Sequence, residues 1–187
     1  MGSIAETAAI RYGTATDAFA LSQLGAATFR ATFAEANDAP LVEAYIADHY
    51  STAMQLAELQ DDRLTYLVAE IDGHLAGFAL LRTDQAHPDV KGTSPIRLAR
   101  IYVETPYLGL GLGSALMERC IEECRLRVHD LLWLGVWERN QKAIAFYERW
   151  GFASVGVEVF DVGGDKQRDV ILTLPVSAGS ASSTTAG

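Results

Sequence analysis

The chain has 187 residues, 49% of them hydrophobic, which is the usual size of a single domain with a sizeable core. Its 15 Lys and Arg residues against 24 Asp and Glu residues give a net charge of −9 at pH 7. This balance argues against broad binding to nucleic acid or to an anionic membrane surface, and it favours a cationic substrate.

No targeting or membrane segment is recognisable. Residues 1–7 (MGSIAET) lack the charged and apolar regions of a secretion signal, and the longest apolar runs have the length of a strand. The sequence therefore predicts a cytosolic protein. We expect one domain over residues 9–175, a short extension over 1–8 and a disordered tail over 176–187, most of which is Ser, Thr, Ala and Gly.

The cysteines and histidines predict no metal site. Cys120 and Cys124 are four residues apart on one face of a predicted helix, which is neither disulfide nor zinc-finger spacing, and the four histidines form no paired ligand set. Both cysteines are predicted to pack in the core.

The N-terminal third is predicted to be mostly helical. Apolar periodicity indicates a short strand near 9–12, then helices from residue 16 or 17 to 30, from 38 or 39 to 48, and from 51 to 60. Pro40 is typical of the start of the second helix, and Ser51 can cap the third.

The middle of the chain predicts three strands. Leu64–Ile71 and Leu75–Arg82 are joined by Asp72-Gly73, a strong signal for a tight hairpin. Ile96–Val103 is the third strand.

The last third alternates helices and strands. A helix with Leu116, Cys120 and Cys124 on one face follows residue 111, and Leu131–Trp137 is a nearly all-apolar strand. A right-handed crossover would place that strand parallel to the preceding one. A further helix over 140–150 precedes two strands, 153–160 and 169–174, that flank a Gly163-Gly164 turn. The order predicts an α/β fold with a mixed sheet flanked by helices.

The stretch Tyr107–Leu116 (YLGLGLGSAL) carries three glycines at alternate positions between a strand and a helix. Glycine lets the backbone approach a ligand closely, and the first turn of a helix offers free N–H groups to an anion. Neither a dinucleotide fingerprint nor a P-loop fits the spacing. The stretch is interpreted as a phosphate-binding turn, although a simple tight connection is the alternative.

Two segments together resemble the GNAT superfamily of acetyl-coenzyme-A-dependent N-acetyltransferases. RIYVETPYLGLGLGSALMERC is similar to the family's acyl-CoA motif, Q/R-x-x-G-x-G/A, with its glycines at Gly111 and Gly113. LLWLGVWERNQKAIAFYERWGF is similar to the family pattern at Asn140, Phe146 and Tyr147. The order of elements agrees over roughly residues 10–174. A weaker likeness, through TFRATFAEAN and GVWERN, is to a branch that acetylates polyamines.

The resemblance implies a mostly antiparallel sheet with one splayed parallel pair of strands, and acetyl-CoA as the donor. It implies the following donor-binding residues: Ile101, Tyr102, Val103, Gly109, Leu110, Gly111, Leu112, Gly113, Ser114, Asn140 and Tyr147. One departure is that Leu108 stands where the motif has Gln or Arg, so backbone amides would carry more of the pyrophosphate binding. Either the affinity for CoA is lower, or the fold has lost its ligand and serves another purpose.

The resemblance also implies catalytic roles. The family's tyrosine lies near the CoA sulfur, so Tyr147 is a candidate general acid for the departing thiolate. From its spacing alone, Tyr147 is more often a core residue than a catalytic one, and Asn140 is also typical of a helix cap, a role compatible with CoA binding. Glu104 and Glu138 follow the two splayed strands and are candidate general bases, with a solvated loop position as the alternative.

We therefore predict an acetyltransferase that acts on a small-molecule primary amine, with a polyamine as one acceptor, by direct attack in a ternary complex. Glu35 and Asp38 could attract its positive charge. The alternatives are a protein N-terminus or lysine as acceptor, or a catalytically silent acyl-CoA-binding module. The oligomeric state is left open, with a homodimer as one arrangement.

Overall fold

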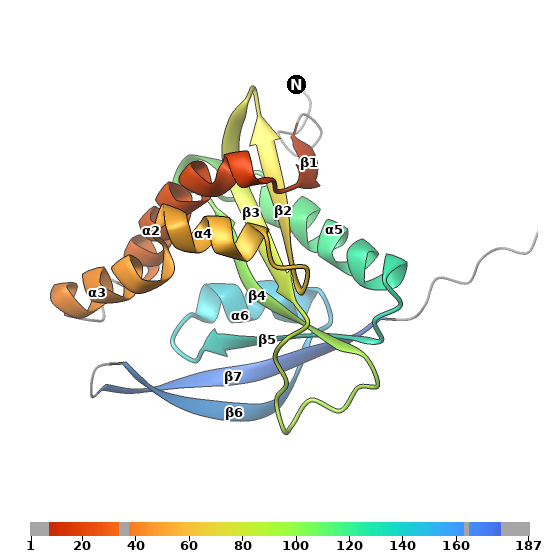
Figure 1. Cartoon of the computed structure of the whole chain (residues 1–187). Helices are drawn as coiled ribbons and strands as arrows, with labels where there is room; N and C mark the ends of the chain where they lie inside the picture. Colours follow the sequence, from red (N-terminus) through yellow and green to blue (C-terminus); the bar gives the residue numbers. More distant parts are fainter. Residues whose placement is uncertain (1–7, 34–37, 163–164, 177–187) are drawn as a thin grey trace, which may run out of the picture.

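The apolar runs of the chain form one seven-stranded sheet in a computed structural model that describes residues 8–33, 38–162 and 165–176. The strands are β1 (Ala9–Tyr12), β2 (Leu64–Ile71), β3 (His74–Arg82), β4 (Pro95–Val103), β5 (Leu131–Trp137), β6 (Ala153–Val162) and β7 (Asp165–Pro175). Their order across the sheet is β1-β2-β3-β4-β5-β7-β6, and only β4 and β5 are parallel. The predicted mixed α/β sheet is confirmed (Figure 1).

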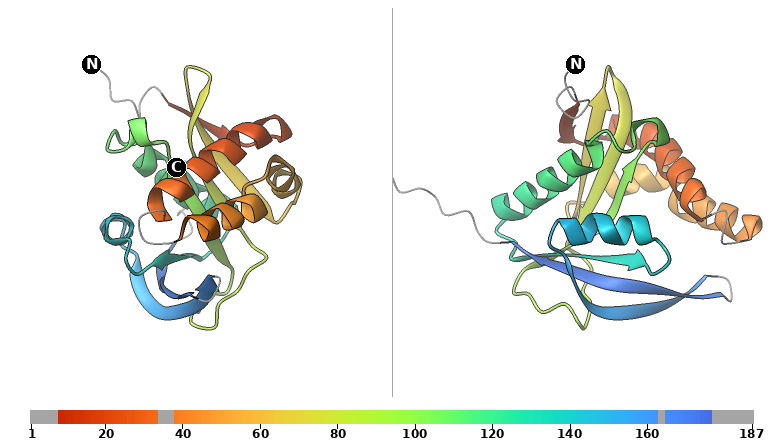
Figure 2. Two further views of the ribbon diagram at one scale, coloured as in Figure 1. Left: turned by 90° about the vertical axis from the view of Figure 1, so that its left-hand side faces the viewer. Right: turned by 180° about the vertical axis from the view of Figure 1, so that it is seen from behind.

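Helices cover both faces of this sheet. They are η1 (Ala15–Asp17), α2 (Ala18–Phe33), α3 (Ala39–His49), α4 (Thr52–Leu59), η2 (Thr105–Tyr107), α5 (Leu112–Leu126) and α6 (Gln141–Arg149). We call the side with α2, α3 and α4 the front face and the side with α5 and α6 the rear face, as the two views of Figure 2 show. The main core lies between the sheet and the rear helices, and a second cluster lies under α2.

Several local predictions are confirmed. The β2–β3 hairpin turns at Asp72 and Gly73, whose φ angles of 50° and 78° are those that a tight hairpin demands. Ser51 caps α4 by accepting the N–H of Met54 at 3.2 Å. Gly151, with φ of 88°, ends α6 in the left-handed conformation.

A bulge in β4 was not predicted. Leu80 of β3 pairs with Arg100 and Leu81 pairs with Leu98, so Ala99 is an extra residue in β4. A bulge of this kind bends the strand and shifts the alternation of its side chains. As a result Arg97, before the bulge, and Arg100 and Tyr102, after it, all lie on the front face, although residues 97 and 100 of a regular strand would lie on opposite faces.

The last two strands are longer than predicted. β6 continues to Val162 and β7 begins at Asp165, because the two strands stay paired through Phe160 with Gln167 and Val162 with Asp165. The predicted Gly163-Gly164 turn, residues 1–7 and the predicted tail from residue 177 lie outside the described residues. None of the helices in the described part of the chain has the length and apolar character that a membrane crossing requires.

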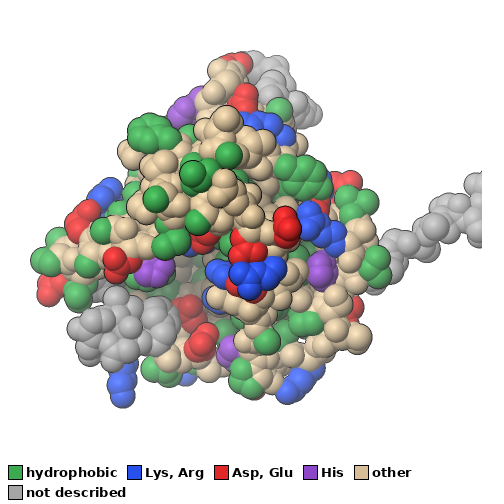
Figure 3. All heavy atoms as spheres, viewed as in Figure 1, with side chains coloured by type: hydrophobic (Ala, Val, Ile, Leu, Met, Phe, Trp, Pro, Cys, Tyr) green, Lys and Arg blue, Asp and Glu red, His purple; other side chains and the backbone are tan. Residues whose placement is uncertain are grey.

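On the front face, basic and acidic side chains lie interspersed (Figure 3). Several of them are paired at short distance, such as Arg63 with Asp61 at 2.6 Å. Mixed charges of this kind are typical of an ordinary solvated surface.

Candidate active site

β4 and β5 run side by side only at their starts. Pro95–Arg97 pair with Leu131–Trp133, and beyond these residues the two strands separate. Each keeps its other neighbour, since β4 stays on β3 to Val103 and β5 stays on β7 to Trp137. The predicted splayed pair is confirmed. The main-chain groups along this opening have no strand partner, so an extended ligand can take that place.

A cavity of about 350 Å³ fills the opening. Phe29 of α2 and Tyr45 of α3 line it from the front, and Ala143 and Tyr147 of α6 line it from the rear. Because residues of both faces line one space, the cavity passes through the sheet. The predicted site residues that line it are Ile101, Tyr102, Val103, Asn140 and Tyr147, together with Leu108.

The glycine turn, Gly109–Ser114, lies directly after Leu108 and leads into α5. Gly109 and Gly111 have φ angles of 77° and 90°, a conformation that favours glycine, and Gly111 is the residue before the first turn of α5. A Cβ at Gly109 would meet nothing within 4 Å, and one at Gly113 would make only ordinary contacts, the nearest 3.8 Å from Val103. Space beside these amides is therefore open, as a phosphate would need.

Leu108, which stands in place of the motif's Gln or Arg, is 60% exposed at this turn. An exposed leucine offers no hydrogen bond to an anion. Any anion at the turn would therefore depend on the backbone N–H groups.

Tyr147 is both packed and cavity-facing. Its ring lies edge-on to Phe146 at 5.5 Å and to Phe152 at 5.6 Å, and only 9% of the residue is exposed. Its hydroxyl has no hydrogen-bond partner among the described residues. Burial raises the pKa of this phenol above its usual value, so Tyr147 holds its proton at neutral pH and can donate it.

Asn140 caps α6, since its Oδ1 accepts the N–H of Ala143 at 3.2 Å. It also lines the cavity. The cap uses only the side-chain oxygen, which leaves the side-chain NH₂ group available to a ligand.

The two glutamates predicted as bases are not brought to the cavity. Glu104 Oε2 lies 2.6 Å from His74 Nε2, and Glu138 Oε2 lies 3.6 Å from Arg168 Nε. Neither residue lines the cavity. Glu35, predicted to attract the acceptor, lies outside the described residues. Asp38, predicted for the same role, is exposed just before α3 and does not cap it through its side chain. The roles of all four acidic residues stay predictions.

Two charged residues in the front half of the cavity were missed. Arg97 of β4 lies over the Trp133 ring, 4.9 Å from its centre, and donates from one terminal nitrogen to Gln85. Asp169 of β7 pairs across the sheet with Trp137, and its Oδ1 is buried without a hydrogen bond. A charged residue within an otherwise apolar strand was the available signal, but residue 169 stood at a predicted strand boundary.

Arg100, in contrast, is fully engaged. It donates to Glu58 at 2.7 Å and to the Tyr66 hydroxyl at 3.0 Å, and it lies over the Tyr50 ring. This network ties β4 to α4 behind the front wall of the cavity. The Tyr102 hydroxyl is also paired, at 3.0 Å from that of Tyr50.

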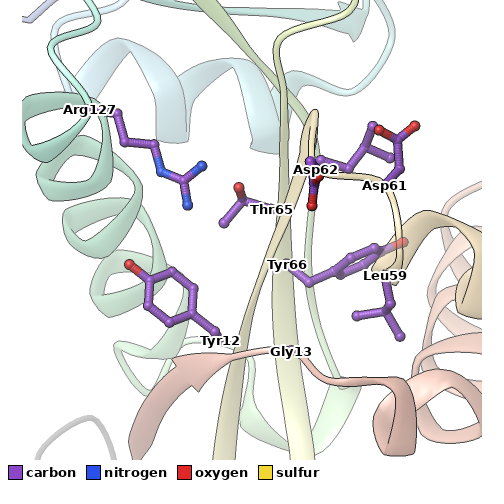
Figure 4. Close-up of a pocket in the computed structure, with 9 residues that line it drawn as sticks. Tyr12, Gly13, Leu59, Asp61, Asp62, Thr65, Tyr66 and Arg127 are labelled. Carbon is purple, nitrogen blue, oxygen red and sulfur yellow. The ribbon is translucent and has the colours of Figure 1, made fainter.

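A separate cavity of about 260 Å³ lies between β1, the start of β2 and the end of α5 (Figure 4). Tyr12 and Arg127, on one side of it, both hydrogen-bond to Glu123. Asp61 and Asp62 lie on the other side. None of the predicted site residues lines this cavity.

Cys120 and Cys124 are free and fully buried on the face of α5 that packs on the sheet, which confirms their predicted packing role. Within the part of the chain that the structure describes, no group of three His, Cys, Asp or Glu side chains is placed to hold a metal ion.

Residues 29–152 match the model of the acetyltransferase (GNAT) family. The chain belongs to this family. It is therefore an acetyltransferase whose donor is acetyl-CoA, as the resemblance implied.

Named relatives agree with this assignment. An uncharacterised N-acetyltransferase of Lactobacillus delbrueckii subsp. lactis, encoded in the pepI 3′ region, is 29% identical over 78% of this chain and 84% of its own length. The [ribosomal protein bS18]-alanine N-acetyltransferase of Escherichia coli K12 is 31% identical over 65% of this chain and 78% of its own. The PaiA N-acetyltransferase of Thermoplasma acidophilum, solved in complex with coenzyme A, shares the fold with a TM-score of 0.74. It is 22% identical in sequence, and the match covers 90% of this chain and 98% of its own. These three do not single out a polyamine as acceptor.

Proposed function

We propose that this chain transfers the acetyl group of acetyl-CoA to a primary amine, by direct attack within a ternary complex. The observation that carries the proposal is the cavity through the sheet, with Tyr147 at its rear and charged and aromatic side chains at its front. A thioester in the opening would thus be reached from the front by the amine and from the rear by a proton donor.

The donor would bind along the rear of the opening. The glycine turn would hold the pyrophosphate through its backbone N–H groups. The pantetheine arm would pair with Ile101–Val103. At these residues, the edge of β4 that faces β5 has no described strand paired to it. A backbone N–H aimed at the thioester oxygen would stabilise the tetrahedral adduct by about 3 kcal/mol.

The reaction then needs three proton movements. The amine nitrogen forms a bond to the carbonyl carbon, and the C–S bond breaks. The Tyr147 hydroxyl supplies a proton to the departing sulfur, and the phenol is restored by the proton that the nitrogen loses. The ammonium must first lose another proton, which leaves to solvent.

The lining of the cavity favours an acceptor with one cationic group on an apolar or aromatic body. Phe29, Phe33, Tyr45 and Trp137 supply aromatic surface. Arg97 adds a positive charge, whereas Arg100 is neutralised by Glu58. A polyamine, with several positive charges, finds one acidic side chain, Asp169, among the described residues of this lining, so this acceptor receives less support than a monoamine.

A protein N-terminus is the second candidate acceptor. It is favoured by the relative from Escherichia coli, which acts on the alanine of a ribosomal protein. A terminal α-amino group is also a single cation, which suits the same lining.

Release of the CoA thiol, measured with each of several acceptors, tests the proposal. We would use phenylethylamine, tyramine, spermidine and a peptide that begins with alanine. The expected result is acceptor-dependent thiol release, faster with a monoamine or the peptide than with spermidine. Saturable binding of acetyl-CoA without thiol release from any acceptor would instead support the silent binding module.

A further inference from the structure

One carboxylate lies inside the cavity. Among the described residues that line it, Asp169 is the acidic one. The other carboxylates near the opening are engaged elsewhere: Glu58 by Arg100, Glu104 by His74 and Glu138 by Arg168. Of the carboxylates that the structure describes, Asp169 is therefore the one placed to meet a cationic acceptor in this space.

The backbone of β5 makes room for this carboxylate. A Cβ added at Gly135 would lie 3.2 Å from Asp169 Oδ2 and 3.6 Å from Asp169 Cβ. The absence of a side chain at Gly135 lets the Asp169 side chain lie across β5, on the front side of the opening. The carboxylate thus faces the space from which an amine would approach a thioester.

Within the described ranges, the Asp169 carboxylate has no hydrogen-bond or ion-pair partner. No Lys, Arg or His nitrogen of the described residues forms an ion pair with Asp169, and its Oδ1 is buried without a hydrogen bond. A buried acceptor without a donor costs free energy, which an ammonium group would recover by donating to it.

The charged and titratable groups around Asp169 come from three elements. Arg97 projects from β4, Glu158 from β6 and Tyr45 from α3. Burial raises the pKa of Asp169 to about 6; within this shift Arg97 acts to lower the pKa and Glu158 acts to raise it. The carboxylate is therefore charged at pH 7, yet it is a stronger base than an exposed aspartate.

We infer that Asp169 is the general base of the reaction: it binds the acceptor ammonium in the front half of the cavity and takes its proton. This inference rests on the proposed function. The ammonium N–H bond breaks and an O–H bond forms on Asp169, which leaves a neutral amine with a free electron pair. That pair attacks the thioester carbon, and Asp169 later returns its proton to solvent.

The test compares Asp169→Asn with Glu158→Gln, using the acceptor that gives the fastest thiol release with the wild type. D169N keeps the size of the side chain and removes its basicity, so kcat/KM should fall by about 100-fold or more. E158Q removes a nearby negative charge but no group that touches the acceptor, so kcat/KM at pH 8 should stay within about twofold.

The pH profiles add a reading that a merely structural role would not produce. Wild-type kcat/KM should fall below about pH 6 as Asp169 becomes protonated. This limb should be absent in D169N and should move to lower pH in E158Q. The titration of the amine itself affects all three proteins alike, and CoA affinity by calorimetry should be unchanged in both variants.

If the wild type is active but D169N has a kcat/KM within twofold of it and the same acid limb, the inference is wrong while the proposed function stands. If D169N does not fold, the inference is wrong if the acid limb of E158Q lies at the same pH as that of the wild type. A wild type that releases no thiol with any acceptor would instead contradict the proposed function.

Discussion

Tyr147 of α6 is both a packed core residue and a residue of the cavity, the two interpretations that its sequence position allows. Its ring packs between Phe146 and Phe152, as a core residue would, while the residue also lines the cavity. The packing holds the phenol in place and keeps it protonated. Its hydroxyl needs a partner, which a bound thioester would supply.

Tyr147→Phe should lower kcat by about 100-fold while leaving the affinity for CoA within about threefold, since it removes only the proton donor. Stopped-flow thiol release and calorimetric CoA titration measure the two quantities. Tyr12→Phe, which removes a phenol hydroxyl bonded to Glu123 outside the cavity, is the matched control and should keep kcat within a few fold. Equal turnover in Y147F would remove Tyr147 from the mechanism.

At the residue scale, the site was only partly predictable. Asn140, Tyr147 and Ile101–Val103 lie at the cavity, as the motifs indicated. Asp169 was not predictable, because its environment is made by β4, β5 and β6, which meet it only in the folded sheet. Glu104 and Glu138 follow the correct strands, but their side chains turn to His74 and Arg168, which no spacing in the sequence foretells.

At the scale of elements, the glycine turn is a joint between strand and helix whose geometry depends on two left-handed glycines. The first N–H groups of α5 precede any carbonyl that could accept them within the helix. Placing a side chain here has two effects: it strains the backbone, and it fills the space beside the amides.

Gly111→Val should abolish CoA binding in calorimetry. Gly73→Val is the matched control, because Gly73 has φ of 78° at the tip of the β2–β3 hairpin, away from the cavity. Both variants should lose about 1–2 kcal/mol in the free energy of unfolding from left-handed strain. G73V should nevertheless bind CoA as the wild type does. Unaltered CoA affinity in G111V would contradict the phosphate assignment.

Most elements were predictable because their signals are local: Asp72-Gly73 for the hairpin, Ser51 and Asn140 for caps, and the apolar run at Leu131–Trp137 for a buried strand. The bulge at Ala99 was not, since it is a relation between two strands. Neither was the extension of β7 back to Asp165, which depends on pairing with β6 and is invisible in the polar segment 165–168.

At the scale of the molecule, the sheet consists of two blocks, β1–β4 and β5–β7–β6, joined through three residue pairs. The rest of their boundary is the opening. A donor that pairs along it would connect the blocks and bind only the folded state.

Coenzyme A at 100 times its dissociation constant should therefore raise the free energy of unfolding by about 2.7 kcal/mol. Hydrogen exchange monitored by mass spectrometry should show new protection at Ile101–Val103 and at the glycine turn. Peptides from β1 should change least. Protection concentrated in β1, with none along β4, would contradict binding in the opening.

The burial of Cys120 and Cys124 has a practical consequence for such experiments. Both sulfurs lie between α5 and the sheet, on the inner face of the helix, so a thiol reagent reaches them only after α5 has separated from the sheet. A colorimetric thiol reagent added to an acetylation assay would consequently react with the liberated coenzyme A and not with the thiols of the folded enzyme. In the absence of substrate, the slow reaction of the same reagent with Cys120 and Cys124 would measure the rate at which the enzyme unfolds.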